Sequence, residues 1–337
     1  VESNYSTSVS FKTKALQDDW VLSDQIPEPA WGRYGCIGYG NGLFIALNSD
    51  GPDSTAGCYS TDGITWDNTG LVIPGEAWRG LAYGASRYVA VSPNNNSTKL
   101  VTSTDGKTWS SSGVTVTTYD FQDIIYCAAN SEFYAVGNDP TNAAFSYSSD
   151  GLTWTSVDAG TGNIKAVAEG GGVLVVAGTT MRYSTDKGRS WNQCTGDISP
   201  GINGKLAYGN GTFVGTSSVN SRVIWSNDGI NWSNAVTNVP SQSWFAVTFG
   251  NGIFVAVSDD GTNQVMWSED GKDWNEVAVP AQSAWYRVIY GGGKFVAASY
   301  SAGSKNFMYS ETGKGAQAEF LAYDADAGKT ISDLGIV

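Results

Sequence analysis

The residues best suited to chemistry in this sequence are carboxylates, because 337 residues include 32 Asp and Glu, 19 Lys and Arg, and no His. The absence of His removes the commonest general base and metal ligand. Without a catalytic Cys motif as well, an acyl-transfer triad is implausible. Two carboxylates across a cleft could still hydrolyse a glycoside, but the sequence singles out no such pair. We therefore predict that the protein is not an enzyme.

Six of the carboxylates occupy the same place in one recurring pattern, Tyr-Ser-x-Asp-Gly-x-Thr-Trp or a close variant. They are Asp62, Asp105, Asp150, Asp186, Asp228 and Asp270. A calcium site needs several oxygens around one ion, whereas each copy offers a single Asp. A short carboxylate can instead accept hydrogen bonds from backbone N–H groups of its own turn. We therefore predict a structural role for these six residues, and neither a metal nor a cofactor.

A second pattern, aromatic-Gly-Asn-Gly-x-Phe-Val-Ala, precedes the first, as in residues 39–46 and 249–256. Asn-Gly and Asp-Gly supply the positive φ angles of tight hairpin turns, and the flanking residues alternate as in strands. One unit of about 42 residues thus predicts four short antiparallel strands, which is typical of a propeller blade. The sequence predicts an all-β fold: a seven-bladed β-propeller of four-stranded antiparallel blades.

Two incomplete copies at opposite ends of the repeat indicate how the ring closes. The copy at residues 309–313 lacks its Trp, and Trp20 ends a copy that lacks its first half. We predict that the strand around Trp20 pairs with the C-terminal blade, which removes an exposed sheet edge. The alternatives for the segment 319–323 are an extra strand, a docking element, or the strand at that same edge. The predicted domains are an N-terminal extension (1–15), the propeller (16–315) and a C-terminal extension (316–337).

The Ser-x-Asp-x-Gly-x-(Thr)-Trp pattern resembles the Asp-box of sialidase-like propellers, over about residues 18 to 313. This resemblance implies that each Asp caps its turn and that each Trp packs between sheets. The paired patterns also resemble repeats of phage tail and bacterial surface proteins. A sialidase needs three Arg, a Tyr–Glu pair and an Asp. The family's Arg-Ile-Pro signature is absent here, because Gln25 precedes Ile26 and Pro27. A glycoside hydrolase of this fold is therefore an alternative only.

Three of the seven Arg residues fall near the predicted starts of the innermost strands, where they could cluster at one mouth of the propeller. Lys165 and Lys205 occupy similar positions. Aromatic residues align at the same point of several repeats. Aromatic and Arg side chains suit a sugar or a protein epitope. The predicted ligand-binding residues are Arg33, Tyr34, Trp78, Arg79, Trp244, Trp285 and Arg287. For the aromatic residues, the alternative is packing between adjacent blades.

Variable polar loops are predicted on the same face, where function usually lies on a rigid scaffold. These loops span residues 48–57, 93–99, 138–143, 217–221, 259–264 and 300–305. Asp50, Asp53, Asp259 and Asp260 could bind a cation there, but we expect solvated loops.

Net charge and hydropathy narrow the possible partners. The formal net charge is −13, which argues against nucleic acid and anionic membrane surfaces. The sequence contains no run of 18 apolar residues, so it predicts no membrane-spanning helix. The four Cys residues are predicted to be free. We predict a non-enzymatic recognition propeller for a glycan or protein receptor, extracellular or virion-associated. The alternative to a receptor-binding module is a structural or assembly component whose partners are other subunits of a larger particle.

Overall fold

The computed structural model describes most of the repeat region and parts of both terminal segments. The described residues are 9–13, 20–24, 33–49, 57–93, 100–116, 120–139, 144–199, 201–219, 221–235, 239–301, 306–314, 320–324 and 329–330. Their regular structure consists of β-strands alone. No helix among these residues is long and apolar enough to span a bilayer.

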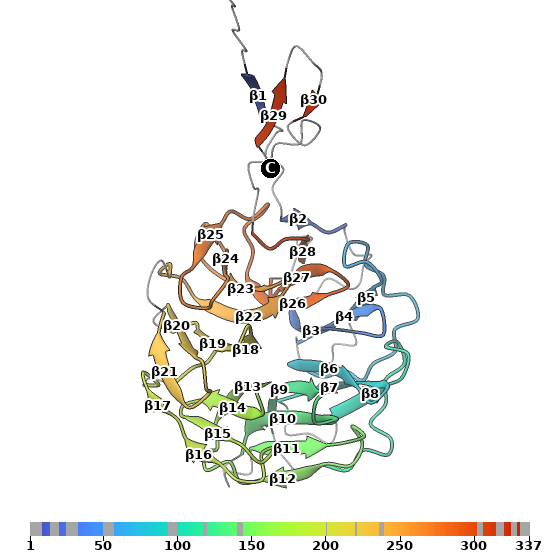
Figure 1. Ribbon diagram of the computed structural model, residues 1–337. Helices are drawn as coiled ribbons and strands as arrows, with labels where there is room; N and C mark the ends of the chain where they lie inside the picture. The colour runs from blue at the N-terminus through green and yellow to red at the C-terminus, as the bar shows by residue number, and fades with distance from the viewer. Residues whose placement is uncertain are drawn as a thin grey trace, which may run out of the picture.

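Seven antiparallel sheets are arranged as blades around a central axis, which confirms the predicted seven-bladed propeller (Figure 1). The first blade contains β3 (Tyr34–Gly40), β4 (Leu43–Asn48) and β5 (Gly57–Ser60). The second contains β6 (Gly80–Gly84), β7 (Arg87–Val91) and β8 (Leu100–Ser103). The third contains β9 (Asp120–Cys127), β10 (Glu132–Asn138), β11 (Phe145–Ser148) and β12 (Thr155–Val157). The fourth contains β13 (Ile164–Gly170), β14 (Val173–Gly178), β15 (Met181–Ser184) and β16 (Asn192–Gln193).

The remaining three blades follow the same up-and-down order. The fifth contains β18 (Leu206–Gly209), β19 (Thr212–Ser217), β20 (Arg222–Ser226) and β21 (Asn231–Asn234), with β17 (Thr195–Gly196) parallel to β21. The sixth contains β22 (Trp244–Gly250), β23 (Ile253–Ser258), β24 (Val265–Ser268) and β25 (Asn275–Val277). The seventh contains β26 (Trp285–Gly291), β27 (Lys294–Ser299), β28 (Phe307–Ser310) and β2 (Val21–Leu22).

The N-terminal strand closes the ring as predicted. Val21 of β2 lies opposite Tyr309, and Leu22 lies opposite Met308. Trp20 is fully buried between the sixth and seventh blades, beside Val255 and other core residues. The C-terminal segment therefore does not occupy this edge. Instead β29 (Phe320–Asp324) pairs with β1 (Val9–Thr13) and β30 (Lys329–Thr330) in a separate three-stranded sheet, drawn outside the ring in Figure 1.

The four-stranded pattern is least complete in the first two blades, whose sheets contain three strands each. Their outermost strand is reduced to single bridges, Tyr59 to Asp67 and Thr102 to Ser110. In the first blade the cause is local. One carboxylate oxygen of Asp67 accepts hydrogen bonds from the backbone N–H and the hydroxyl of Thr69, at 2.8 and 2.7 Å. This competition by a side chain turns the chain away from the sheet.

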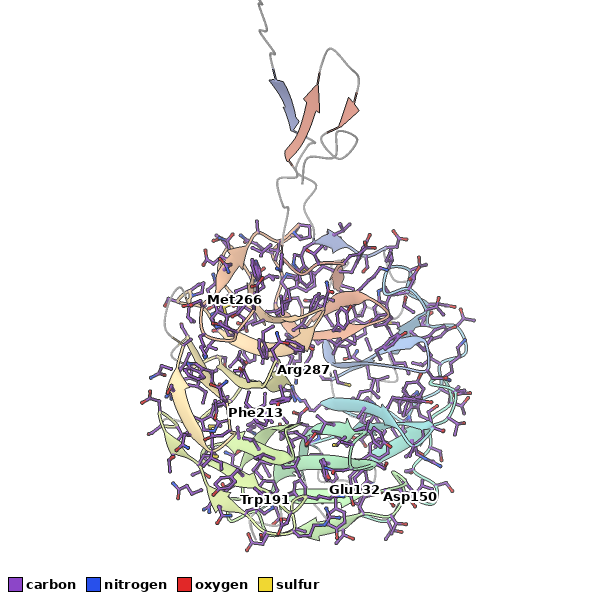
Figure 2. The ribbon with its side chains drawn as sticks, viewed as in Figure 1. Glu132, Asp150, Trp191, Phe213, Met266 and Arg287 are labelled. Atoms are coloured by element: carbon purple, nitrogen blue, oxygen red, sulfur yellow. The ribbon has the colours of Figure 1, made fainter. Side chains whose placement is uncertain are left out.

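The hydrophobic core is divided among the interfaces between neighbouring blades. Each buried cluster combines strands of two blades; one, for example, joins Ala246 of the sixth blade to Phe295 of the seventh. Met266 and Phe213 in Figure 2 are 0% and 1% exposed and belong to two further clusters of this kind. Because each cluster lies between two blades, each blade depends on its neighbours for burial of its apolar side chains.

Close contact between inner strands depends on glycine. A Cβ atom added at Gly84 would lie 2.1 Å from the ring of Tyr126 on the next blade. The same aromatic-on-glycine contact recurs at five other interfaces. Between the third and fourth blades, Glu169 takes the aromatic position and Cys127 the glycine position, with the Cys127 Sγ 3.2 Å from Oε2 of Glu169. All four Cys are free, as predicted.

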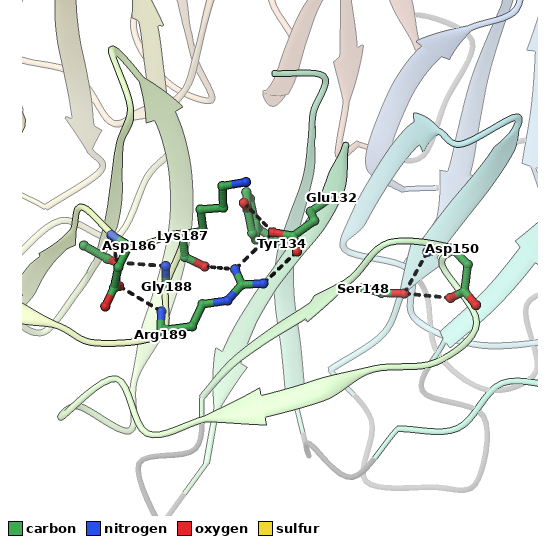
Figure 3. A network of polar contacts seen from close by, with 9 residues as sticks. Glu132, Tyr134, Ser148, Asp150, Asp186, Lys187, Gly188 and Arg189 are labelled. Carbon is green, nitrogen blue, oxygen red and sulfur yellow. Dashed lines mark hydrogen bonds and ion pairs between the residues drawn. The ribbon is translucent and has the colours of Figure 1, made fainter. Parts of the chain in front are cut away.

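The six repeated Asp side chains bind their own turns, as predicted. In the second blade, Oδ1 of Asp105 accepts hydrogen bonds from the backbone N–H groups of Lys107 and Thr108, both at 2.8 Å, and from the hydroxyl of Ser103. Burial raises the pKa of Asp105, but these donors outweigh burial and lower it to about 2. Figure 3 shows two further copies, at Asp150 and Asp186. We call these six turns the aspartate turns.

Candidate binding site at the channel mouth

A channel of about 470 Å³ runs between the innermost strands of the blades. At one end it meets a second hollow of about 250 Å³, and Arg79, Lys205 and Arg287 line both spaces. Figure 2 places Arg287 near the centre of the ring. We call this end the mouth, and its principal lining residues are Arg79, Gln122, Lys165, Asn203, Lys205, Phe245, Tyr286 and Arg287.

Irregular pairing at the start of the inner strands turns these side chains toward the axis. The register between β26 and β27 shifts between Trp285 and Arg287, so that Tyr286 is an extra residue. The same shift leaves Lys165 and Phe245 unpaired at the start of β13 and β22. A bulge of this kind bends a strand and re-aims a side chain. Two consecutive residues, Tyr286 and Arg287, therefore both face the mouth.

The aromatic residues predicted from the sequence to bind a ligand do not line the mouth. Tyr34, Trp78, Trp244 and Trp285 are all 0% exposed and belong to the cores between blades. The indole N–H of Trp244 donates to the carbonyl of Pro240 at 3.0 Å. A fully buried side chain has no surface to offer a ligand, so the packing alternative is correct for these four residues.

The aromatic residues at the mouth are instead Phe245 and Tyr286, joined by Tyr300. Their rings form a series, with centroids 4.7 Å apart from Phe245 to Tyr286 and 4.8 Å apart from Tyr286 to Tyr300. The sequence prediction missed them, although Phe245 and Tyr286 directly follow the aligned residues Trp244 and Trp285. When the repeats are aligned, Phe245 and Tyr286 occupy the position directly after the one chosen. The bulge is the reason that this next position faces the axis.

The three predicted Arg residues do gather around this aromatic series. The guanidinium carbons of Arg33 and Arg79 lie 5.7 and 5.8 Å from the ring centroid of Tyr300. The guanidinium carbon of Arg287 lies 4.1 Å from the Tyr286 ring. Lys165 and Lys205 extend the same cluster. The structure thus brings Arg79, Arg287, Lys165 and Lys205 together at the mouth, with Arg33 near Tyr300, whereas a role in ligand binding stays a prediction.

Most of these cations lack an acidic partner. Lys205 forms an ion pair with Asp123. Within the described residues, Arg79, Lys165 and Arg287 form no ion pair, and the Nε of Arg287 is buried without a hydrogen-bond partner. Unpaired charge that is partly withdrawn from water is unfavourable. The described residues thus concentrate positive charge at the mouth, although the whole chain carries a net charge of −13.

The pKa shifts at the mouth have the sign expected of a positive field. Burial lowers the pKa of Lys205 and the Arg287 charge lowers it further, while the Asp123 carboxylate opposes them. Burial raises the pKa of Tyr286, but Arg287, Arg79 and Lys205 outweigh burial and lower it overall. A phenol with a lowered pKa indicates that the site stabilises negative charge.

The described lining of the mouth is rich in cations and poor in carboxylates. Among the described residues that line the mouth and the channel, Asp123 is the one carboxylate, and it is paired with Lys205. No Tyr–Glu pair lies among these lining residues. Across the described residues, no group of three His, Cys, Asp or Glu could hold a metal ion. The predicted loops near the mouth fall largely outside the described residues; of the four Asp residues considered there, Asp50 and Asp53 lie outside them.

Comparisons with known proteins identify the architecture. No family model matches the sequence, and no curated protein sequence matches it. Similar solved structures include YCF48 with a bound D1 peptide, at 12% identity and a TM-score of 0.59, covering 89% of this chain and 97% of that chain. Virginiamycin B lyase from Staphylococcus aureus is 11% identical with a TM-score of 0.68, covering 89% and 99%. The RRP9 WD40 repeats are 10% identical with a TM-score of 0.66, covering 89% and 99%. These similarities show the propeller fold.

Proposed function

We propose that this chain is a non-enzymatic recognition propeller that binds a carboxylate-bearing segment of a partner protein at the channel mouth. The observation that carries the proposal is the cluster of Arg79, Lys165 and Arg287, which form no ion pair within the described residues. Arg pairs with carboxylates in a bidentate geometry that adds specificity to affinity. A ligand carboxylate would supply a negative charge to pair with these three cations.

The net charge of −13 does not prevent an acidic ligand from reaching this site. At physiological ionic strength the Debye length is about 8 Å, so distant surface charges are largely screened. Charges inside a concave, low-dielectric mouth are screened less and focus the field. The local cations therefore decide which ligand is attracted there. The acidic outer surface would reduce nonspecific adhesion of other acidic molecules.

A propeller of this kind can present a peptide-binding surface, because the similar structure of YCF48 carries a bound D1 peptide. That precedent concerns the fold, while the charge at the mouth concerns this chain. The setting predicted from the repeat, on a virion tail or a bacterial surface, rests on the sequence alone. The same holds for the alternative of a structural component of a larger particle.

A second candidate ligand is an acidic glycan, which the series Phe245, Tyr286 and Tyr300 favours. Aromatic faces can stack on the C–H faces of sugars, and the neighbouring Arg residues could bind a sugar carboxylate. A glycan would then bind the same mouth residues as a peptide, but the partner would belong to another class of molecule. The glycan candidate is therefore separated from the protein candidate by the identity of the ligands retained.

The test compares ligand classes on the full chain and on the double variant Arg79→Gln, Arg287→Gln. Labelled protein is applied to arrays of acidic and neutral peptides and of acidic and neutral glycans, at low and high NaCl. We expect retention of acidic peptides, weaker retention at high salt, and loss in the double variant. The substitution Lys272→Gln, on the opposite face, is the matched control and should change nothing.

Two outcomes would count against the proposal. Retention of acidic glycans without acidic peptides would keep the mouth as the site but reject a protein partner. Equal retention of acidic and neutral ligands, or unchanged retention by the double variant, would reject the mouth itself.

A further inference from the structure

A smaller hollow of about 190 Å³ lies beside the mouth, between the fourth and fifth blades. Lys165 and Asn203 line both spaces, so the hollow and the mouth are continuous. Its walls are mostly apolar and include Ile202, Val219 and the backbone of Gly201. A cationic site and an apolar site therefore lie on either side of one lysine.

Val219 is unusual because it is exposed. Among the described residues, only Val72 and Val219 are large hydrophobic residues with exposed side chains, at 62% and 54%. The loop that carries Val219 is held in place by Asn203. Oδ1 of Asn203 accepts hydrogen bonds from the hydroxyl of Ser217 at 2.9 Å and from the backbone N–H of Ser218 at 3.0 Å. A loop fixed in this way holds an apolar side chain at the edge of the hollow.

We propose that the mouth and this hollow form one bipartite site for a peptide segment in which an acidic residue is adjacent to an apolar residue. The inference rests on the proposed function, which it deepens. The acidic side chain binds at Arg79 and Arg287, and the apolar side chain packs against Ile202 and Val219. A glycan fits the hollow less well, because the walls carry no aromatic face on which a sugar could stack.

The experiment selects binders from a displayed library of random heptapeptides on the full-length chain. We expect enrichment of sequences in which Asp or Glu neighbours Leu, Ile, Val, Met or Phe. Enrichment of acidic residues without apolar neighbours would overturn the bipartite site and leave the proposed function standing. Selection without enrichment of acidic residues, or no selection at all, would overturn both.

Two matched variants locate the apolar subsite. One enriched peptide is titrated against wild type, Val219→Ser and Val72→Ser. Both changes are at exposed positions, so neither should disturb folding. Burial of part of a Leu-sized side chain is worth about 1.4 kcal/mol, so Val219→Ser should weaken binding about tenfold, whereas Val72→Ser should leave it unchanged. Equal effects of the two variants would overturn the assignment of the hollow.

Discussion

The two faces of the propeller arrange their cations differently, although Arg79 and Arg287 at the mouth also lie near tyrosine rings. On the face of the aspartate turns, four cations each lie over an aromatic ring of the preceding blade, at distances of 3.8 to 4.6 Å. The pairs are Lys107 with Tyr59, Arg189 with Tyr147, Lys272 with Trp225, and Lys314 with Trp267. At the mouth, Arg79, Lys165 and Arg287 form no ion pair within the described residues.

This difference fits a stabilising role for the turn-face cations and the proposed binding role for the mouth cations. A cation that follows a turn glycine and covers the ring of the neighbouring blade connects two blades. Cations gathered at an inner mouth repel one another and lower one another's proton affinity, as at Lys205. Functional sites commonly retain such unfavourable arrangements because the arrangement serves binding. If the two faces differ in this way, substitutions on the turn face should reduce stability, whereas removal of a mouth cation should not.

The largest expected effect is the loss of stability in acid, because all six aspartate turns contribute to it. Hydrogen bonds to the carboxylates of Asp105, Asp186 and Asp228 hold their folded-state pKa values at about 2, below about 3.9 in an unfolded chain. The unfolded chain then binds more protons, so this stability is present above about pH 4 and is lost as the pH falls toward 2. Thermal unfolding midpoints measured from pH 6 to pH 2 should fall steeply. An unchanged midpoint between pH 5 and pH 2 would contradict this role for the turns.

A single aspartate turn should show a smaller effect of the same origin. Asp105→Ala removes the acceptor for two backbone N–H groups and the Ser103 hydroxyl. Loss of a comparable helix cap reduces stability by about 0.5–2 kcal/mol, and we expect about 1–2 kcal/mol here. Asp105→Asn keeps one acceptor oxygen and should lose about half as much. Urea unfolding of the wild type and the two variants measures both losses of stability. Equal losses in the two variants would argue against the hydrogen bonds as the cause.

The turn face was largely predictable from the sequence, and the mouth was not. The aspartate turns follow from residues within one short segment, so the pattern around Asp105 predicts its local hydrogen bonds. Ring closure was also predictable, because the orphan Trp20 and the incomplete copy at Tyr309 complement each other. The mouth depends on register shifts such as that around Tyr286. A shift of one residue exchanges which side chains are buried and which face the axis.

This physical reason explains both errors in the predicted site. Trp285 was a candidate ligand-binding residue with packing as the alternative, but it is buried, and Tyr286 faces the mouth instead. Arg79 and Arg287 were found because both fall near the predicted start of an inner strand. The hollow beside Val219 had no local signal, because two blades build it together.

On the turn face, Arg189 offers a direct test of the cation–aromatic contacts. Its guanidinium lies 3.8 Å from the Tyr147 ring centroid and forms two hydrogen bonds with Glu132, at 3.0 and 2.7 Å (Figure 3). Arg189→Gln removes both interactions, and exposed interactions of these kinds contribute about 0.5–1 kcal/mol each. We expect a loss of about 1 kcal/mol in urea unfolding. Glu132→Gln, which leaves the ring contact, should lose less; a larger loss there would assign the stabilisation to the ion pair.

The smallest expected effect has the opposite sign and lies at the mouth. Arg287→Gln removes one of the like charges that lower the pKa of Lys205, while the Gln side chain keeps part of the contact with Tyr286. Relief of repulsion at a binding site commonly stabilises a protein, and we expect a gain of about 0.5–1 kcal/mol in urea unfolding with an unchanged m value. The same variant should have a higher pKa at Tyr286, measurable by ultraviolet titration of the tyrosines, because Arg287 is the first of the cations that lower it. A loss of stability as large as that of Arg189→Gln would show that Arg287 supports the fold as the turn cations do. The contrast between the two faces would then be wrong, because cations on both faces would serve the structure.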